Sequence, residues 1–232
     1  DSAEVTVTEV TGLSASGIGT GWDIEISGGT VTVDVQATAA DCLVYGIIPY
    51  YDAVISSGTV TVNAISLNGP AYGLSSYMGD IFISGGEVTV NTEATDGDAY
   101  GVYVDYGSVF ALTNGVVNTR AKVTGDLGYA YGVGDHKSEI TGGKITAIGD
   151  NWAFAASDSS DRLIVASTLT VRTSENIEGT CLSEVSPSVV TEVGSEYKYV
   201  VIEYLQKDDT PSGNSGSSSK PSKPSKPVEP EI

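Results

Sequence analysis

One octapeptide pattern recurs through the first two thirds of the chain and restricts its architecture more than any other feature. It reads Ile-Ser-Gly-Gly-Thr-Val-Thr-Val at 26–33 and returns, with substitutions, at 55–62, 83–90, 112–119 and 140–147. The glycine at its fourth position recurs at intervals of 29, 28, 29 and 28 residues. A constant interval of this length is typical of a solenoid, in which each repeat forms one coil that stacks on its neighbours.

Each copy has the alternation of a strand with one buried face. Residues 30–35 read Thr-Val-Thr-Val-Asp-Val, which is the strand period and not the helical one. Similar strands at a constant interval favour stacking of each strand on its own copy, and therefore a parallel β-helix over an antiparallel sandwich. Gly29 and its equivalents are suited to a positive φ, so the chain is expected to bend there. Two columns are predicted to face the interior: Ile26, Ile55, Ile83, Leu112 and Ile140, and then Val31, Val60, Val88, Val117 and Ile145.

We therefore predict an all-β fold, a single-stranded right-handed parallel β-helix of about seven coils. The number includes degenerate copies around 5–7 and 169–171, and the hand follows the general preference for right-handed crossovers. Residues 197–205 are predicted to form a last strand that caps the open end of the stack. The predicted domain covers 1–205. Residues 206–232, which hold five of the eight prolines, are predicted to be a disordered Ser/Lys/Pro-rich linker.

The charge of the chain excludes two classes of partner. The net charge is −19, and no Lys or Arg precedes Arg120, whereas residues 1–119 carry 14 Asp or Glu. Such a field repels nucleic acid and anionic membranes, and no apolar run is long enough to insert into a membrane. Cys42 and Cys181 lie about five coils apart, roughly 24 Å, so two free thiols are expected. We expect a monomer and, since no leader peptide is present, a mature fragment.

The octapeptide resembles the repeats of large secreted surface proteins of Gram-positive bacteria, whose β-helical regions are similar to the pectate-lyase-like superfold. The resemblance covers about residues 3–175. It implies a secreted or cell-wall-associated extracellular protein, adhesin-like or carbohydrate-binding, with a polysaccharide or a host or cell-wall glycan as its partner. A related carbohydrate-binding family uses calcium, and the segment of this chain that resembles it is Asp96-Gly97-Asp98. The superfold also includes polysaccharide lyases and glycoside hydrolases, which are the alternative function.

Two polar columns are candidates for binding Ca²⁺. In the first, each aspartate lies six residues before an aligned glycine, and carboxylates on successive coils repel by roughly 1 kcal/mol in water, a cost that a cation would remove. Its members are Asp23, Asp52 and Asp80. The second lies four residues before a recurrent Tyr-Gly pair and consists of Asp41, Asn68 and Asp96, with Asp98 and Asp126 nearby. The alternatives are an Asx turn at the start of each strand and an asparagine ladder without metal.

The 13 tyrosines divide into two groups by strand parity. Those of the Tyr-Gly pairs share parity with the apolar residue two positions later, which predicts an internal aromatic ladder of Tyr45, Tyr72, Tyr100 and Tyr131 beside Ile47, Leu74, Val102 and Val133. The others fall on the opposite face or in the following loops, where aromatic rings can stack on sugars. The candidates for glycan contact are Tyr50, Tyr51, Tyr77, Tyr103 and Tyr106.

No catalytic residue is predicted. A lyase of this superfold needs a base and cations, and the candidates are only Arg120, Lys122, Lys144 and Arg172. His136 is the only histidine, so a histidine-dependent triad is not expected. A glycosidase needs two carboxylates, and nothing in the sequence singles out a pair. We therefore interpret the chain as non-catalytic.

Overall fold

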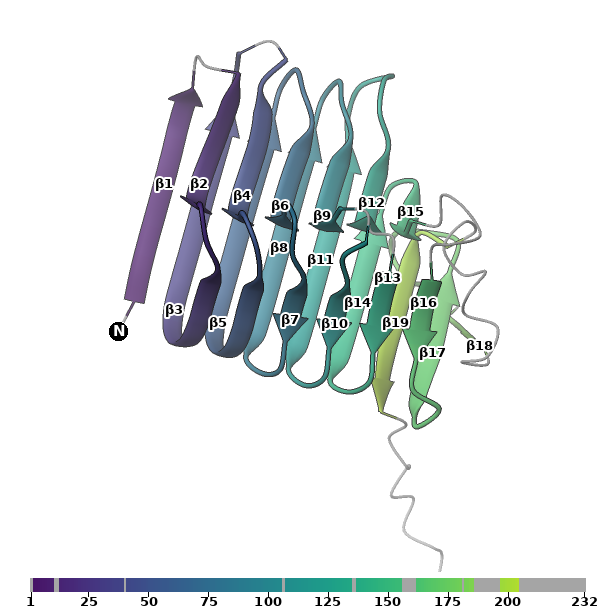
Figure 1. Ribbon diagram of the computed structural model, residues 1–232. Coiled ribbons are helices and arrows are strands. Elements are labelled where there is room, and N and C mark those ends of the chain that lie inside the picture. Colours follow the sequence, from purple (N-terminus) through teal and green to yellow (C-terminus); the bar gives the residue numbers. More distant parts are fainter. Residues whose placement is uncertain are drawn as a thin grey trace, which may run out of the picture.

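The chain forms an all-β solenoid of about five turns (Figure 1). The computed structural model describes residues 2–10, 13–39, 41–105, 107–134, 137–155, 162–180, 182–185 and 197–204. Over these ranges it contains strands and no helix, and therefore none that is long and apolar enough to cross a membrane. The predicted all-β, parallel repeat architecture is confirmed. Cys181, His136, Tyr106 and the predicted linker at 206–232 lie outside the described residues.

Each coil passes through two sheets whose neighbouring strands run parallel through the stack. The six-stranded sheet contains β2 (Ser14–Thr20), β4 (Leu43–Pro49), β6 (Ala71–Ser76), β9 (Ala99–Val104), β12 (Ala130–Gly134) and β15 (Trp152–Phe154). The long strands of the thirteen-stranded sheet are β1 (Ser2–Val10), β3 (Ile24–Ala37), β5 (Ala53–Ser66), β8 (Glu87–Ala94), β11 (Val116–Val123) and β14 (Lys144–Gly149). Its short strands are β7 (Ile81–Ile83), β10 (Phe110–Leu112), β13 (Lys137–Ile140) and β16 (Arg162–Val165).

The aligned glycines make the predicted bend between the short and long strands of a coil. Their φ angles are all positive, between 74° and 95°, at Gly29, Gly58, Gly86, Gly115 and Gly143. This left-handed region carries little steric cost for glycine alone. In the first two coils the strand continues through the bend as β3 and β5, whereas later coils divide it into two strands.

Both predicted apolar columns lie in the core. The strand register places equivalent residues of successive coils opposite each other, for example Ile55 beside Ile83 and Val60 beside Val88. All members are buried except Val31 in β3, which is half-buried. A slip of one residue would expose every one of these side chains, and this fixes the register of the whole stack.

The parallel stacking of the long strands ends at β14, whereas β15 and β16 still pair in parallel with β12 and β13. The last three strands run antiparallel. They are β17 (Leu169–Ser174), β18 (Ser183–Val185) and β19 (Tyr199–Tyr204). β19 pairs with both β14 and β17, so the copy at 169–171 does not stack on β14 as predicted. In this coil Thr168 stands where the others have the bend glycine, and a β-branched residue strongly disfavours a positive φ. Val200 and Ile202 of β19 instead cover the apolar edge of β14.

Candidate aromatic binding surface

Four tyrosines and a tryptophan stack along the six-stranded sheet, one from each of five successive strands. We call them the tyrosine ladder: Tyr45, Tyr72, Tyr100, Tyr131 and Trp152. Neighbouring ring centroids are 5.0 to 5.3 Å apart, and the ring planes differ by 5° to 22°. The parallel register alone produces this arrangement, because it places each tyrosine directly above its copy.

The ladder lies on the outer face of the sheet, so the prediction of an internal ladder is wrong. The glycine after each tyrosine faces the interior: a Cβ on Gly73 would lie 2.1 Å from Val90 Cγ1, a buried side chain of the opposite sheet. Tyr72, the preceding residue, therefore points outward and is half-buried, whereas Leu74 is fully buried. Inward and outward side chains do not alternate through the glycine. Each tyrosine therefore points outward although the apolar residue two positions later points inward.

The ladder is broadened by Tyr103, whose predicted role in glycan contact remains untested. Its ring centroid lies 5.2 Å from that of Tyr72 and 5.0 Å from that of Tyr100. The Tyr100 hydroxyl donates a hydrogen bond to Asp98 Oδ2 at 3.1 Å. Burial, followed by the charge of Asp98, raises the pKa of Tyr100, and burial also raises the pKa values of Tyr72 and Tyr103.

A second group of aromatic residues lies where the chain leaves β2, β4 and β6. We call it the aromatic cluster: Trp22, Tyr50, Tyr51 and Tyr77. The Tyr50 centroid lies 5.0 Å from Tyr51 and 5.3 Å from Tyr77, and Trp22 lies 6.0 Å from Tyr51. The exposed fractions are 73% for Trp22, 55% for Tyr77, 41% for Tyr51 and 40% for Tyr50. Exposed aromatic groups of this size commonly mark interaction sites.

The structure thus brings together three of the predicted glycan-contact residues, Tyr50, Tyr51 and Tyr77, and adds Trp22. Sequence reasoning missed Trp22, although a signal was present. Trp22 precedes Asp23 as Tyr51 precedes Asp52, so the repeat alignment places the two aromatic residues at equivalent positions. The two groups are neighbours in space, because Tyr77 directly follows β6, the strand that carries Tyr72 of the ladder. Burial and, after it, the charge of Tyr77 raise the pKa of Tyr45.

A hollow of about 390 Å³ lies beside the aromatic cluster. It is lined by Gly19, Thr20, Ile48, Pro49, Tyr50 and Tyr77. Apolar and aromatic side chains form most of this lining, and the Thr20 hydroxyl accepts a hydrogen bond from the Trp22 backbone N–H at 3.1 Å. A concave apolar surface with few polar groups is a common form of ligand site.

The first aspartate column stacks as predicted, and its carboxylates bind the backbone of the next coil. Asp23 Oδ1 accepts from the Asp52 N–H at 3.1 Å, and Asp52 Oδ1 accepts from the Asp80 N–H at 2.8 Å. Asp80 Oδ1 accepts from the Val109 N–H at 2.7 Å. Each aspartate therefore holds the next coil in register. Within the described residues, no group of three or more His, Cys, Asp or Glu is placed to hold a metal ion.

The second polar column forms stacked loops. Asp41 has a φ of 56°, and its backbone N–H donates to the Asn68 carbonyl at 3.0 Å. Asn68 Nδ2 donates to the Thr38 carbonyl at 3.4 Å. A Cβ on Gly125 would lie 2.2 Å from Asp96 Oδ1, which places that loop directly beside the next coil. Asp98 Oδ1 accepts from the Tyr129 N–H at 2.8 Å.

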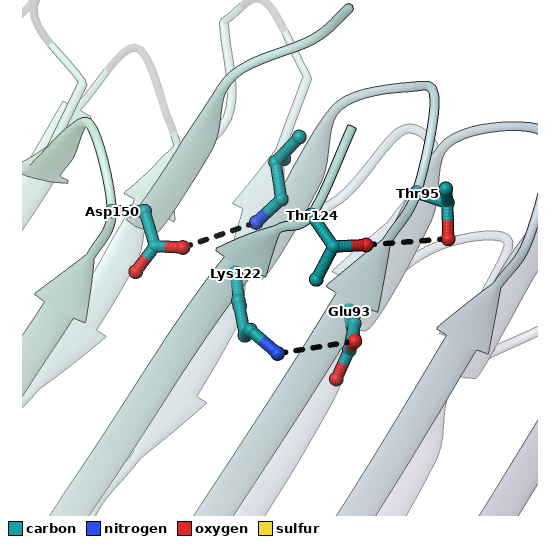
Figure 2. A network of polar contacts seen from close by, with 6 residues as sticks. Glu93, Thr95, Lys122, Thr124 and Asp150 are labelled. Atoms are coloured by element: carbon teal, nitrogen blue, oxygen red, sulfur yellow. Dashed lines mark hydrogen bonds and ion pairs between the residues drawn. The ribbon is translucent and has the colours of Figure 1, made fainter. Parts of the chain in front are cut away.

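The four basic candidates lie in the thirteen-stranded sheet. Lys122 Nζ lies 3.3 Å from Glu93 Oε1 (Figure 2), and both Lys122 and Arg120 border a second hollow of about 190 Å³. Lys144 and Arg172 both pair with Glu203 of β19, with Lys144 Nζ 2.8 Å from Oε2. Although burial acts to raise it, these two cations hold the pKa of Glu203 below its ordinary value. This pairing joins β14, β19 and β17.

The two outer faces of the solenoid therefore have different chemistry, and the aromatic cluster is the feature that suits ligand contact. Its rings come from three successive coils and stand beside a hollow. No protein-family model, curated protein or solved structure matches the chain.

Proposed function

We propose that the chain is a non-catalytic, extracellular module of a bacterial cell surface that binds polysaccharide through the aromatic cluster. The supporting observation is the exposure of four aromatic rings around Tyr50, beside the hollow of about 390 Å³. Sugar rings present apolar C–H faces that stack on aromatic side chains. Rings that project from the ends of stacked strands are already ordered, which lowers the entropic cost of binding.

An extracellular, adhesin-like role is supported by the resemblance of the octapeptide repeat to those of Gram-positive surface proteins. A solenoid of stacked coils is a rod that can display a lateral surface, and repeat architectures commonly use such extended surfaces for binding. The alternative is a polysaccharide lyase or glycoside hydrolase of the same fold. Incubation with the bound polysaccharide tests it, because release of unsaturated products or new reducing ends would overturn the non-catalytic assignment.

We also propose that binding depends on Ca²⁺. The support is the second polar column, Asp41, Asn68 and Asp96, in which carboxylate and amide oxygens recur once per coil and the Asp41 loop bonds the Asn68 loop. Oxygen ligands from such a column suit calcium. A ligand that binds only the folded state raises the melting temperature, so added Ca²⁺ is expected to raise it and a chelator to lower it. An unchanged melting temperature in both conditions rejects calcium.

For the fold itself, we propose a right-handed solenoid of about seven coils in which β19 caps the open end of the stack. Right-handed crossovers are the strong general preference between parallel strands. The number of seven includes the terminal coils formed around β1 and β17. An antiparallel strand laid on β14 protects an edge that would otherwise template pairing with another chain. Deletion of 162–232 is therefore expected to cause aggregation, and a monomeric product would contradict the cap.

The proposed function is tested by removing rings singly from the aromatic cluster. We expect Trp22→Ala and Tyr77→Ala each to weaken binding to a positive glycan-array ligand by about 1 to 2 kcal/mol, five- to thirtyfold. Tyr204→Ala is a matched control, since Tyr204 of β19 is 54% exposed and Tyr77 is 55% exposed. The melting temperatures should stay close to that of the wild type. Full retention of binding by both cluster variants, or an equal loss of affinity in the control, rejects this surface.

A further inference from the structure

Acidic side chains directly follow the aromatic cluster in each of the coils that build it. Asp23 follows Trp22, Asp52 follows Tyr51, and Asp80 lies three residues after Tyr77. One oxygen of each carboxylate accepts a backbone N–H of the next coil, which fixes the side chain at the end of the aromatic turn. Formal negative charge is thus held in place beside the exposed rings.

No basic residue of this part of the chain compensates the charge. The sequence contains no Lys or Arg before Arg120, so the coils that carry the cluster have none. The first basic side chains, Arg120 and Lys122, project from β11 of the thirteen-stranded sheet. Uncompensated charge of one sign raises the local concentration of ligands of the other sign and repels ligands of the same sign.

We propose that the aromatic cluster selects polysaccharides that carry free amino groups. This inference rests on the proposed function and names the class of glycan. A protonated amine over the face of Trp or Tyr gains a cation–π interaction, which a neutral sugar lacks. The aspartate column adds a longer-range attraction that acts over about 8 to 10 Å at physiological salt. A uronic acid chain has neither interaction and meets repulsion, so the expected order of affinity is amine-bearing, neutral, acidic.

The direct test compares three oligosaccharides of equal length with the full chain: deacetylated chitosan, its fully N-acetylated counterpart, and an oligogalacturonate. Measurements at about pH 5.5 keep the amine of the sugar protonated. We expect the amine-bearing form to bind about tenfold more tightly than the acetylated form, and higher salt to reduce this preference. Equal affinity for the two overturns the inference while leaving polysaccharide binding intact. No binding by any of the three oligosaccharides overturns both.

Charge-neutral variants separate the carboxylates from the rings. Asp23→Asn combined with Asp52→Asn keeps an oxygen that accepts the next coil's N–H but removes two charges. We expect the preference for the amine-bearing form to fall to about threefold, with affinity for the acetylated form unchanged. Asp34→Asn is the control, because Asp34 of β3 is hydrogen-bonded to Asn63 of β5 within the thirteen-stranded sheet and is not part of the aspartate column. An undiminished preference in the double variant, or tighter binding of the oligogalacturonate to the wild type, contradicts the inference.

Discussion

The outer faces of the two sheets carry ladders of similar residues that are held together by different forces. On the six-stranded sheet, aromatic rings stack about one coil apart, as between Tyr72 and Tyr100 at 5.1 Å. On the thirteen-stranded sheet, Asn63 Nδ2 donates to Asp34 Oδ1 at 2.6 Å and Asn91 Nδ2 donates to Asn63 Oδ1 at 2.9 Å. The same parallel register produces both ladders. The aromatic face presents ring surfaces and the other face presents amides and carboxylates, so the register supplies the order and the side chains set the chemistry of each face.

The largest expected effect is the loss of stability when the aromatic face ionises. Burial raises the pKa values of Tyr45, Tyr72, Tyr100, Tyr103 and Tyr131 above their ordinary value. An unfolded tyrosine loses its proton near pH 10, whereas the folded chain keeps it to higher pH. Above that pH the folded state binds more protons than the unfolded state, so the free energy of unfolding falls as pH rises. The stabilisation is fully present below about pH 10.

Urea unfolding at a series of alkaline pH values, with phenolate absorbance recorded in parallel, measures this effect. The late-titrating tyrosines are expected to ionise together with unfolding. Replacing Tyr72 and Tyr100 by Phe should reduce the slope of stability against pH, because two of the shifted groups are removed. A free energy of unfolding that stays constant above about pH 10 contradicts the raised tyrosine pKa values of this face.

The next largest effect is expected at the glycines that follow the ladder tyrosines and face the interior. Gly73→Ala would place a Cβ 2.1 Å from Val90 Cγ1 and 2.7 Å from the Gly101 carbonyl oxygen. Overpacking of this kind costs about 3 kcal/mol, because the backbone has to shift. Denaturant unfolding checks it. Gly21→Ala is the control, since nothing lies within 4 Å of its added Cβ, and its expected change is below about 0.5 kcal/mol. Similar losses in both variants would mean that the sheets are not closely packed at Gly73.

The sequence predicted what depends on register and missed what depends on local exceptions to it. The apolar columns, the positive φ of Gly58 and the stacking of Asp23 on Asp52 follow from the constant interval alone. The outward direction of Tyr72 does not follow from the interval. Inward and outward residues stop alternating at Gly73, where only a glycine leaves room for Val90 of the opposite sheet. That contact lies between sheets, and a repeat alignment holds no information about it.

The end of the stack and the full extent of the aromatic cluster were also missed in the sequence. β19 enters the sheet antiparallel between β14 and β17, a pairing between segments far apart in the chain. The replacement of the bend glycine by Thr168 was a usable signal. For the aromatic cluster, Tyr50 and Tyr51 were predicted from their loop positions and Tyr77 from its position on the opposite strand face. Trp22 could be found only by aligning the coils.

A smaller effect is expected from the hydrogen-bonded ladder of the other face. Asn63→Asp removes the donor to Asp34 and places two carboxylates on neighbouring strands. We expect a loss of about 2 kcal/mol, part of which is recovered at high salt because the repulsion is screened. Asn63→Ala should cost about 1 kcal/mol and show no salt recovery. If salt affects both variants equally, the like-charge explanation is wrong.

The smallest effect is expected at the ion pair between Lys122 and Glu93 on the same face (Figure 2). The Lys122 side chain is 43% exposed and the Glu93 side chain 40%, so water and salt screen their attraction. A double-mutant cycle with Lys122→Ala and Glu93→Ala should give a coupling energy of about 0.5 kcal/mol or less. Thr124 and Thr95 directly follow β11 and β8, and their hydroxyl oxygens, 3.3 Å apart, continue the contacts between these two coils. A coupling above about 1 kcal/mol would show that charge, and not the shared register, holds β8 and β11 together at this edge.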